Sequence, residues 1–390
     1  MTAEQLLTAD LPDVGESRGK ASGLVEIIRT SFALVEPQSE ELGRHFYATL
    51  FSTAPETRDL FPVNMEVQRS RLLRALVHVV QMVDQREELV PFLRQLGRDH
   101  RKFGVLSQHY DAVGGALIAA IGHFSGDAWT PEVKGAWTYA YGVVASAMRT
   151  AAQAERGPAS WLGRVVGHQR LSWDLATITV QASEPIPYRA GQYVSVETPQ
   201  RPRLWRYLSP ANAPRPDGVL EFHVRAVDSG WVSRALVAHS RVGDTWRIGP
   251  PMGRMHIDPA SDREVLMVAG GTGTAPVKAL LEDLTNRPNP PRTQVFVGGR
   301  TWEDLYDFGA LRKLSYSNTW LDVIPVVEKD ESASGAERGT LADVVTRYGA
   351  WADHDVLVCG SPSMIRATVS RMLVAGTPLD RIRYDPFTMD

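Results

Sequence analysis

The stretch "VLMVAGGTGTAP" (265–276) decides the fold of the last third of the chain. It begins with an unbroken apolar run, which is typical of a strand buried on both faces. A glycine-rich turn follows, and Pro276 suits the first turn of a helix. Glycines let a backbone approach a phosphate closely, and the next helix offers free N–H groups, so this order favours a phosphate site over a plain tight connection. The residues expected in this site are Gly270, Gly271, Thr272, Gly273 and Thr274.

The same sequence pattern continues through residues 261–390. Short apolar runs alternate with helical stretches such as "APVKALLEDL" (275–284). This alternation predicts an α/β nucleotide domain, in which helices cover both faces of a parallel sheet. A second turn of this kind, "VLVCGSPSM" (356–364), would place Cys359 and Gly360 at the carboxyl edge of the sheet, where ligands bind in such folds. The alternative is that Cys359 is simply a small buried residue.

Arg300 follows the strand "TQVFVGG" (293–299), where a dinucleotide fold often has an acid for the ribose hydroxyls. An arginine at this place could favour a 2′-phosphate. The sequence therefore leaves the choice between NADH and NADPH open.

Residues 157–260 have a different pattern. Short runs with alternating polarity, such as "TITVQAS" (177–183) and "VLEFHVRAV" (219–227), are separated by glycine and proline. This pattern predicts an antiparallel β-barrel domain.

Residues 20–156 have the periodicity of helices. In "QRSRLLRALVHVVQMV" (68–83) the apolar residues recur every three or four positions, so the segment is expected to be a helix with one buried face. Prolines divide the region, and helix ends are expected at Pro55, Pro62, Pro91 and Pro131. The three textures together predict a multidomain fold of the order α, β, α/β, which suits a chain of 390 residues.

The composition narrows the class of protein. The net charge is −3, so no nucleic acid is expected as a partner. The single cysteine suits a reducing compartment, and the first residues lack the features of a secretory signal, so we expect a cytoplasmic protein. The longest apolar run, "AVGGALIAAIG" (112–122), is too short to span a membrane. No obligatory protein partner is evident, and the oligomeric state is not determined.

Residues 160–390 resemble the ferredoxin–NADP reductase superfamily. Seven motifs occur in the family's order, and "VFVGGRTWEDLYD" (295–307) looks especially like the reductase halves of bacterial oxygenases. The motifs are "YRAGQYVSV", "RLWRYLSP", "GWVSRAL", "GPPMG", "AGGTGTAP", "CGSPSM" and "YDPF". The resemblance implies FAD as a cofactor and a reduced nicotinamide as the electron donor.

The resemblance also assigns residues to the flavin. Tyr207 would lie against the flavin ring or its ribityl chain, and Phe387 would stack near the ring unless it only closes a domain interface. The pyrophosphate would be cradled by Gly230, Trp231, Val232 and Ser233.

The strand "RLWRYLSP" (203–210) departs from the family pattern. With Tyr207 aligned, Trp205 replaces the family's arginine and Leu208 its serine. Strand alternation would place Arg203, Trp205, Tyr207 and Ser209 on one face, so Arg203, Arg206 and Ser209 can substitute from shifted positions. Asp385 stands where the family has a glutamate.

Residues 20–156 resemble the globin domain of flavohaemoglobins, in which a globin is fused to such a reductase. The matching stretches are "HFYATLFSTAPETRDLFP" (45–62), "VQRSRLLRAL" (67–76), "RDHRKFGVLSQHY" (98–110) and "AWTYAYGVV" (136–144). The resemblance implies haem b, with His100 as the ligand of its iron and Tyr110 beside that ligand. On the other side of the haem it implies Tyr47 and Gln68 as hydrogen-bond donors, Leu72 as an apolar wall and Phe61 packed on the ring.

One family feature is missing on the proximal side. A glutamate usually pairs with the proximal tyrosine and histidine, and here its position falls on Ala154. Glu155 is adjacent but would point about 100° away around a helix.

The resemblance implies a nitric oxide dioxygenase. In this hypothesis, electrons pass from NADH or NADPH through FAD to haem, where O2 oxidises nitric oxide to nitrate. A second hypothesis keeps the haem and flavin but changes the donor, for example to lactate, or the acceptor, because the departures cluster along the electron path. The third hypothesis is a gas-binding sensor, which the attached reductase argues against.

Overall fold

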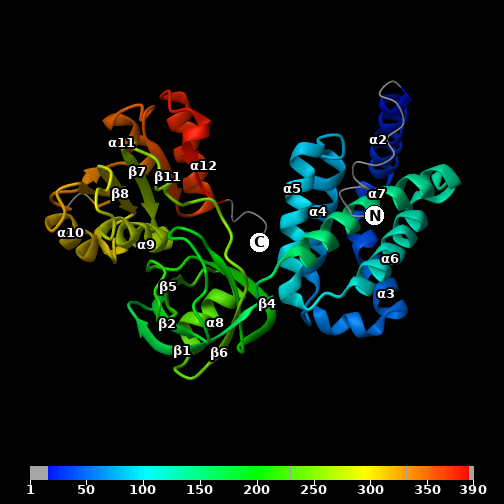
Figure 1. Cartoon of the computed structure of the whole chain (residues 1–390), viewed down its shortest axis with the longest axis horizontal. Coiled ribbons are helices and arrows are strands. Elements are labelled where there is room, and N and C mark those ends of the chain that lie inside the picture. The colour runs from blue at the N-terminus through cyan, green and yellow to red at the C-terminus, as the bar shows by residue number, and fades with distance from the viewer. Residues whose placement is uncertain (1–15, 229, 331–332, 386–390) are drawn as a thin grey trace. The chain divides into compact units, whose positions relative to one another are not determined.

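The computed structural model describes residues 16–228, 230–330 and 333–385, with side chains from residue 23 onward (Figure 1). The chain divides between Ala159 and Ser160 into an N-terminal unit and a C-terminal unit, and each is described here by itself. No helix among the described residues is long and apolar enough to cross a membrane.

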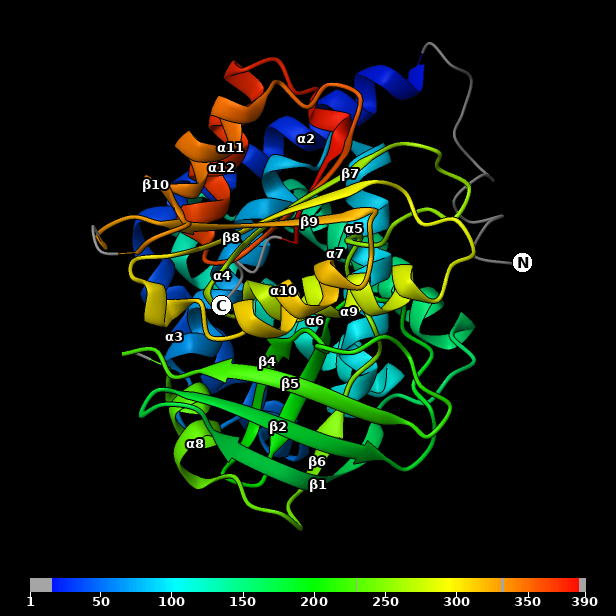
Figure 2. The ribbon, with the colours of Figure 1, turned by 90° about the vertical axis from the view of Figure 1, so that its left-hand side faces the viewer.

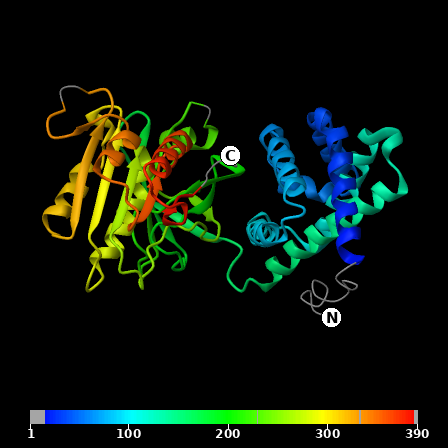
Figure 3. The ribbon, with the colours of Figure 1, turned by 90° about the horizontal axis from the view of Figure 1, so that it is seen from above.

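The N-terminal unit is entirely helical, and Figure 3 shows its helices from above. Its α-helices are α2 (Glu16–Val35), α3 (Ser39–Thr53), α4 (Glu66–Gln81), α5 (Arg86–His100), α6 (Ser107–Ser125) and α7 (Pro131–Ala154). Short 3-10 turns join them: η1 (Glu36–Gln38), η2 (Pro55–Leu60), η3 (Arg101–Phe103) and η4 (Gly126–Ala128). The described helices bury two apolar clusters, one centred on α3 and α6 and the other between α5 and α7.

Prolines mark most of the helix boundaries in this unit. Pro55 begins η2, and Pro131 begins α7, whose N-cap Thr130 accepts a hydrogen bond from the backbone of Val133. The expectation of a helix end at Pro91 is wrong, because Pro91 lies inside α5. Burial of Leu89 and Leu93 on either side of it keeps the helix continuous despite the missing backbone donor.

The first part of the C-terminal unit is an antiparallel barrel of six strands. They are β1 (Trp161–Arg170), β2 (Leu175–Ala182), β3 (Val194–Thr198), β4 (Arg201–Leu208), β5 (Val219–Arg225) and β6 (Thr245–Ile248), in the order β4-β3-β6-β1-β2-β5. A bridge between Pro210 and Phe222 brings the end of β4 to β5, which closes the sheet on itself. The interior is filled by large side chains such as Phe222 and Trp246, and α8 (Trp231–His239) follows β5.

The second part is a parallel sheet in the order β10-β9-β8-β7-β11-β12. The strands are β7 (Val265–Gly270), β8 (Thr293–Gly299), β9 (Leu321–Val327), β10 (Glu337–Arg338), β11 (Asp355–Cys359) and β12 (Ile382–Arg383). The helices are α9 (Thr274–Thr285), α10 (Phe308–Tyr316), α11 (Leu341–Tyr348) and α12 (Pro362–Val374), with the short turns η5 (Gly271–Gly273), η6 (Trp302–Asp304) and η7 (Leu379–Arg381).

The parallel sheet is buried on both faces, as its unbroken apolar strands predict. Side chains of β7 alternate between two clusters: Met267 packs with α9 and α10, and Val268 packs with α11 and α12. Figure 2 shows α9 and α10 on the side of the sheet that faces the barrel. Met255 and Ile257, which follow the barrel strands, pack into the same cluster as α9.

Gly191 forms one of the closest backbone contacts in the C-terminal unit. Its φ is +89°, and a Cβ atom there would lie 1.6 Å from the carbonyl oxygen of Met255. Only glycine fits a turn that must be both left-handed and in contact with another backbone.

Gly191→Ala is therefore expected to lower the free energy of unfolding of the C-terminal unit by about 3 kcal/mol or more. The control is Gly309→Ala in α10, where no atom lies within 4 Å of the added Cβ and alanine is expected to raise stability by up to about 1 kcal/mol. Urea unfolding followed by tryptophan fluorescence measures both. Equal stability of the two variants would contradict the prediction.

Candidate functional site

His100 is the last residue of α5, and close packing of α5 on α7 fixes its position. A Cβ atom at Gly97 would lie 2.2 Å from the carbonyl oxygen of Met148, so the two helices cross with their backbones in contact. The Nδ1 atom of His100 lies 2.8 Å from the carbonyl oxygen of Leu96 and must donate to it, which leaves the lone pair on Nε2. Burial lowers the pKa of His100, so its imidazole is neutral. A neutral ring with Nδ1 held by a carbonyl is the form that binds haem iron, and His100 fits that group.

The surroundings of His100 include a buried ion pair. Lys102 is 1% exposed, and its Nζ atom lies 2.6 Å from Oδ1 of Asp99. Tyr110 is also buried, and its backbone oxygen accepts a hydrogen bond from the hydroxyl of Tyr141. Burial raises the pKa of Tyr110. The part of the chain that the structure describes contains no hydrogen bond between the Tyr110 hydroxyl and His100.

The position of the family's proximal glutamate lies at the end of α7. Ala154 is the last residue of this helix and is exposed, and Glu155 leaves the helix with an extended backbone. Neither position therefore brings a carboxylate to a buried imidazole.

Tyr47, Phe61, Gln68 and Leu72 come together from α3, the end of η2 and α4. Tyr47 is buried, and its ring lies 5.4 Å from that of Phe61. Its hydroxyl lies 3.5 Å from the backbone oxygen of Gln68, which makes this a weak bond. Burial raises the pKa of Tyr47, so the hydroxyl keeps its proton and can donate it to a ligand. Leu72 packs against the same apolar cluster.

The outer face of β4 carries the aromatic side chains. Tyr207 lies edge-on to Tyr193 at 5.0 Å, and the guanidinium of Arg247 lies 5.2 Å from the centre of the Trp205 ring. Leu208 packs into the barrel core, so it presents no polar group on the outer face.

The predicted alternation along β4 is wrong at Arg203. This residue has a left-handed φ of 64°, next to a bulge in the pairing of β3 with β4, and such a break disrupts strict alternation. Its backbone N–H donates to Glu197. Arg206 on β4 is paired with Val196 on β3, and Ser209 follows the end of β4.

Gly230 is the N-cap of α8, so the first backbone N–H groups of this helix follow it directly. Ser233 donates a hydrogen bond to the carbonyl of Gly230 and accepts one from the backbone of Val227. Trp231 is 67% exposed, whereas Val232 is buried and anchors the helix to the barrel core. Free N–H groups at a fixed helix start suit an anionic ligand.

The two βα turns of the parallel sheet meet backbone to backbone. A Cβ atom at Gly273 would lie 2.4 Å from the carbonyl oxygen of Cys359, and Gly271 has a left-handed φ of 56°. Cys359 ends β11 and is 5% exposed, and its thiol contacts the sulfur of Met255. Burial raises the pKa of this thiol, so it is neutral. Cys359 thus lies at the carboxyl edge of the sheet and is also a small buried residue, as the two interpretations of the sequence proposed.

Asp385 is buried beside Gly253, and its Oδ1 atom accepts a hydrogen bond from the backbone of Arg254. Burial raises the pKa of Asp385 to about 6. Phe387 lies outside the described residues.

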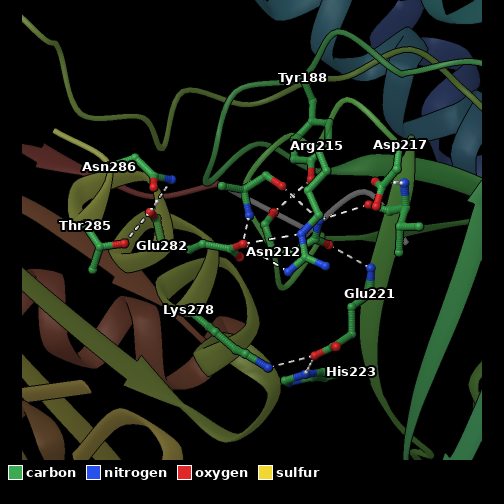
Figure 4. A network of polar contacts seen from close by, with 12 residues as sticks. Tyr188, Asn212, Arg215, Asp217, Glu221, His223, Lys278, Glu282, Thr285 and Asn286 are labelled. Atoms are coloured by element: carbon green, nitrogen blue, oxygen red, sulfur yellow. Dashed lines mark hydrogen bonds and ion pairs between the residues drawn. The ribbon is translucent and has the colours of Figure 1, made fainter. Parts of the chain in front are cut away.

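Sequence reasoning missed a polar network that joins the barrel to α9 (Figure 4). Lys278 binds Glu221, which also contacts His223, and one helical turn further along Glu282 binds Arg215. His223 and Tyr306 both stand in stretches that the sequence singled out, "VLEFHVRAV" and "VFVGGRTWEDLYD", but only the fold brings them within a hydrogen bond.

Three family models match the chain in sequence. Residues 44–148 match the globin model, residues 163–257 the oxidoreductase FAD-binding domain and residues 267–370 the oxidoreductase NAD-binding domain.

Similar proteins cover nearly the whole chain. The flavohemoprotein of Bacillus subtilis is 25% identical over 93% of this chain and 96% of its own. The flavohemoprotein of Bordetella parapertussis is 30% identical over 67% of this chain and 70% of its own. The structure of the flavohemoglobin from Malassezia yamatoensis with bound FAD and heme is 19% identical, covers 93% of this chain and 98% of its own, and has a TM-score of 0.76, which shows that the fold is shared.

The raised pKa of Asp385 makes folding depend on pH. Because the folded state holds this proton up to pH of about 6, while the unfolded chain releases it near 3.8, stability falls as the pH rises between these values. Asp385→Asn is therefore expected to be about 2 kcal/mol more stable than the wild type at pH 7, with the difference vanishing near pH 4.

Urea unfolding of both proteins across this pH range measures the effect. Asp380→Asn, which removes the charge of a carboxylate whose side chain is 75% exposed, is the control and is expected to change stability by less than about 0.5 kcal/mol. A wild type that gains stability over Asp385→Asn as the pH rises would contradict the assignment.

Proposed function

This chain belongs to the flavohemoprotein family, and we propose that it passes electrons from a reduced nicotinamide through FAD to haem, where O2 oxidises nitric oxide to nitrate. It is an oxidoreductase with a globin domain, an FAD-binding domain and an NAD-binding domain. Haem would supply the iron at which the two gases react, and FAD would accept the two electrons of a hydride and pass them on one at a time. The single cysteine fits the compartment that we propose, the cytoplasm.

The observation that carries the proposal is that one helical unit contains both a neutral His100 and a protonated Tyr47. The hydrogen bond to Leu96 orients the His100 ring and keeps Nε2 available for iron. The Tyr47 hydroxyl and the Gln68 side chain would donate to a diatomic ligand, whereas Leu72 and Phe61 would exclude water. Tyr110 would lie beside His100, on the side of the haem where this histidine binds the iron.

The C-terminal unit would supply the electrons. Tyr207, Arg203, Arg206 and Ser209 would line the flavin, while Gly230, Trp231, Val232 and Ser233 would hold its pyrophosphate. The turn from Gly270 to Thr274, together with Cys359 and Gly360, would hold the nicotinamide dinucleotide.

A different donor is the second candidate, and the β4 strand favours it. Leu208 packs into the core where the family has a hydroxyl, and Trp205 is buried where the family has an arginine. The hydride-accepting side of the flavin would thus differ from that of the family, which favours a donor such as lactate.

Loss of haem tests the role of His100. His100→Ala is expected to retain less than about a tenth of the haem of the wild type, with unchanged FAD content, because the ligand is removed from one unit only. Pyridine haemochrome and flavin assays on the purified chain measure both. His123→Ala, on the exposed side of α6, is the control and keeps its haem.

The reaction itself is tested by anaerobic mixing with NADH, NADPH and lactate in separate experiments, followed by addition of O2 and nitric oxide. Flavin bleaching, haem reduction and rapid nitrate formation with a nicotinamide are expected. Tyr47→Phe should slow nitric oxide consumption by about 100-fold, and Tyr139→Phe on the surface should not. Reduction by lactate alone would favour the second candidate.

A further inference from the structure

We propose that Tyr306 and His223 are positioning residues for the nicotinamide dinucleotide, acting through a buried relay that ends in the glycine-rich turn. The inference rests on the proposed function, because that turn is the proposed phosphate site. Neither residue belongs to the turn itself. They reach it through hydrogen bonds that link β5 of the barrel to the start of α9.

The relay consists of four side chains in a row. Thr274 at the start of α9 lies 2.7 Å from the hydroxyl of Tyr306, and this hydroxyl lies 2.8 Å from Nδ1 of His223. On the other side of the ring, Nε2 of His223 lies 2.9 Å from Oε1 of Glu221. At the near end, the Thr274 hydroxyl is 3.0 Å from the carbonyl oxygen of Gly271, inside the turn.

Burial and charge determine the protonation states of Glu221 and Tyr306. The side chain of His223 is 1% exposed, whereas Glu221 and Lys278 beside it are about one-third exposed and give protons a route from solvent. Hydrogen bonds from His223 and Lys278 hold the pKa of Glu221 at about 2 against its desolvation, so this carboxylate stays ionised. Burial raises the pKa of Tyr306, which keeps its hydroxyl proton.

Two further charged groups lie near the ring of His223. Burial raises the pKa of Asp307, which follows Tyr306. Arg225, two residues along β5, is paired with Asp174.

Proton counting shows what a neutral His223 does. Because the Glu221 carboxylate can only accept, the single ring proton lies on Nε2, and Nδ1 accepts from Tyr306. The Tyr306 oxygen then accepts the proton of Thr274. Thr274 has no second hydroxyl proton, so the carbonyl of Gly271 loses its side-chain donor and keeps the backbone N–H of Thr274.

A protonated His223 reverses the chain. Nδ1 now donates to Tyr306, Tyr306 donates to Thr274, and Thr274 donates to Gly271. All three contacts present in the structure are satisfied together only in this arrangement. In this arrangement His223 and Tyr306 hold the Thr274 hydroxyl against the carbonyl of Gly271, inside the glycine-rich turn.

Calorimetric titration of the purified full chain with NAD+ and with NADP+ tests the relay. Tyr306→Phe is expected to weaken binding of the preferred dinucleotide by about fivefold. His223→Gln should have the same effect and replaces Tyr306→Phe in the test if that variant does not fold. In stopped-flow mixing, the limiting rate of flavin reduction should change by less than about twofold, because the relay acts on binding.

Two controls separate the relay from other effects. Arg215→Ala breaks the Glu282 contact between the barrel and α9, and Tyr316→Phe removes an exposed hydroxyl; both should keep the affinity of the wild type.

The outcomes are distinct. A wild type that binds a dinucleotide, with Tyr306→Phe showing the same affinity, overturns the relay alone. A wild type that binds neither dinucleotide overturns the proposed function and the relay with it. An equal loss of affinity in Arg215→Ala would overturn the relay, because it would show that general contact between the barrel and α9 positions the turn.

Discussion

At Gly97, Gly191 and Gly273 the backbone lies so close to another segment that a Cβ atom would overlap with it. Each contact supports a different part of the electron path. Gly97 lets α5 cross α7 and so places His100, Gly191 joins the barrel to the segment around Met255, and Gly273 brings the two βα turns together. Because a side chain at any of these places would push the segments apart, all three sites depend on the absence of a Cβ atom.

Burial then determines the charge of the groups that these contacts position. Removal from water disfavours the charged form, so His100 stays neutral, Tyr47 keeps its proton and the Cys359 thiol is not ionised. Glu221 is the counterexample, because hydrogen bonds from His223 and Lys278 outweigh its desolvation. The chain thus has neutral groups at its proposed haem site and an ionised carboxylate at one end of the proposed relay.

The contact between the barrel and α9 is more than a packing surface. Lys278 and Glu282 lie one helical turn apart and bind partners from separate segments of the barrel region, Glu221 and Arg215. The buried chain through His223 and Tyr306 adds a link with a direction, since its hydrogen bonds can run either way. Such a link joins the barrel to the start of the glycine-rich turn through side chains that are distant in sequence.

The sequence alone predicted the three patterns and the order of the domains, because periodicity and motif order are local properties of the chain. The resemblance in sequence also proposed His100, among ten histidines, as the haem ligand. It failed where tertiary packing opposes a local rule: Pro91 lies within a helix held by Leu89 and Leu93, and Arg203 leaves the strand alternation at a bulge.

Only the tertiary structure showed that Cys359 is buried at the sheet edge and that His223 meets Tyr306, 83 residues further along the chain. The physical reason is that burial and hydrogen-bond partners are set by segments distant in sequence. The sequence specifies which groups are present, whereas folding decides which of them lose water and which of them touch.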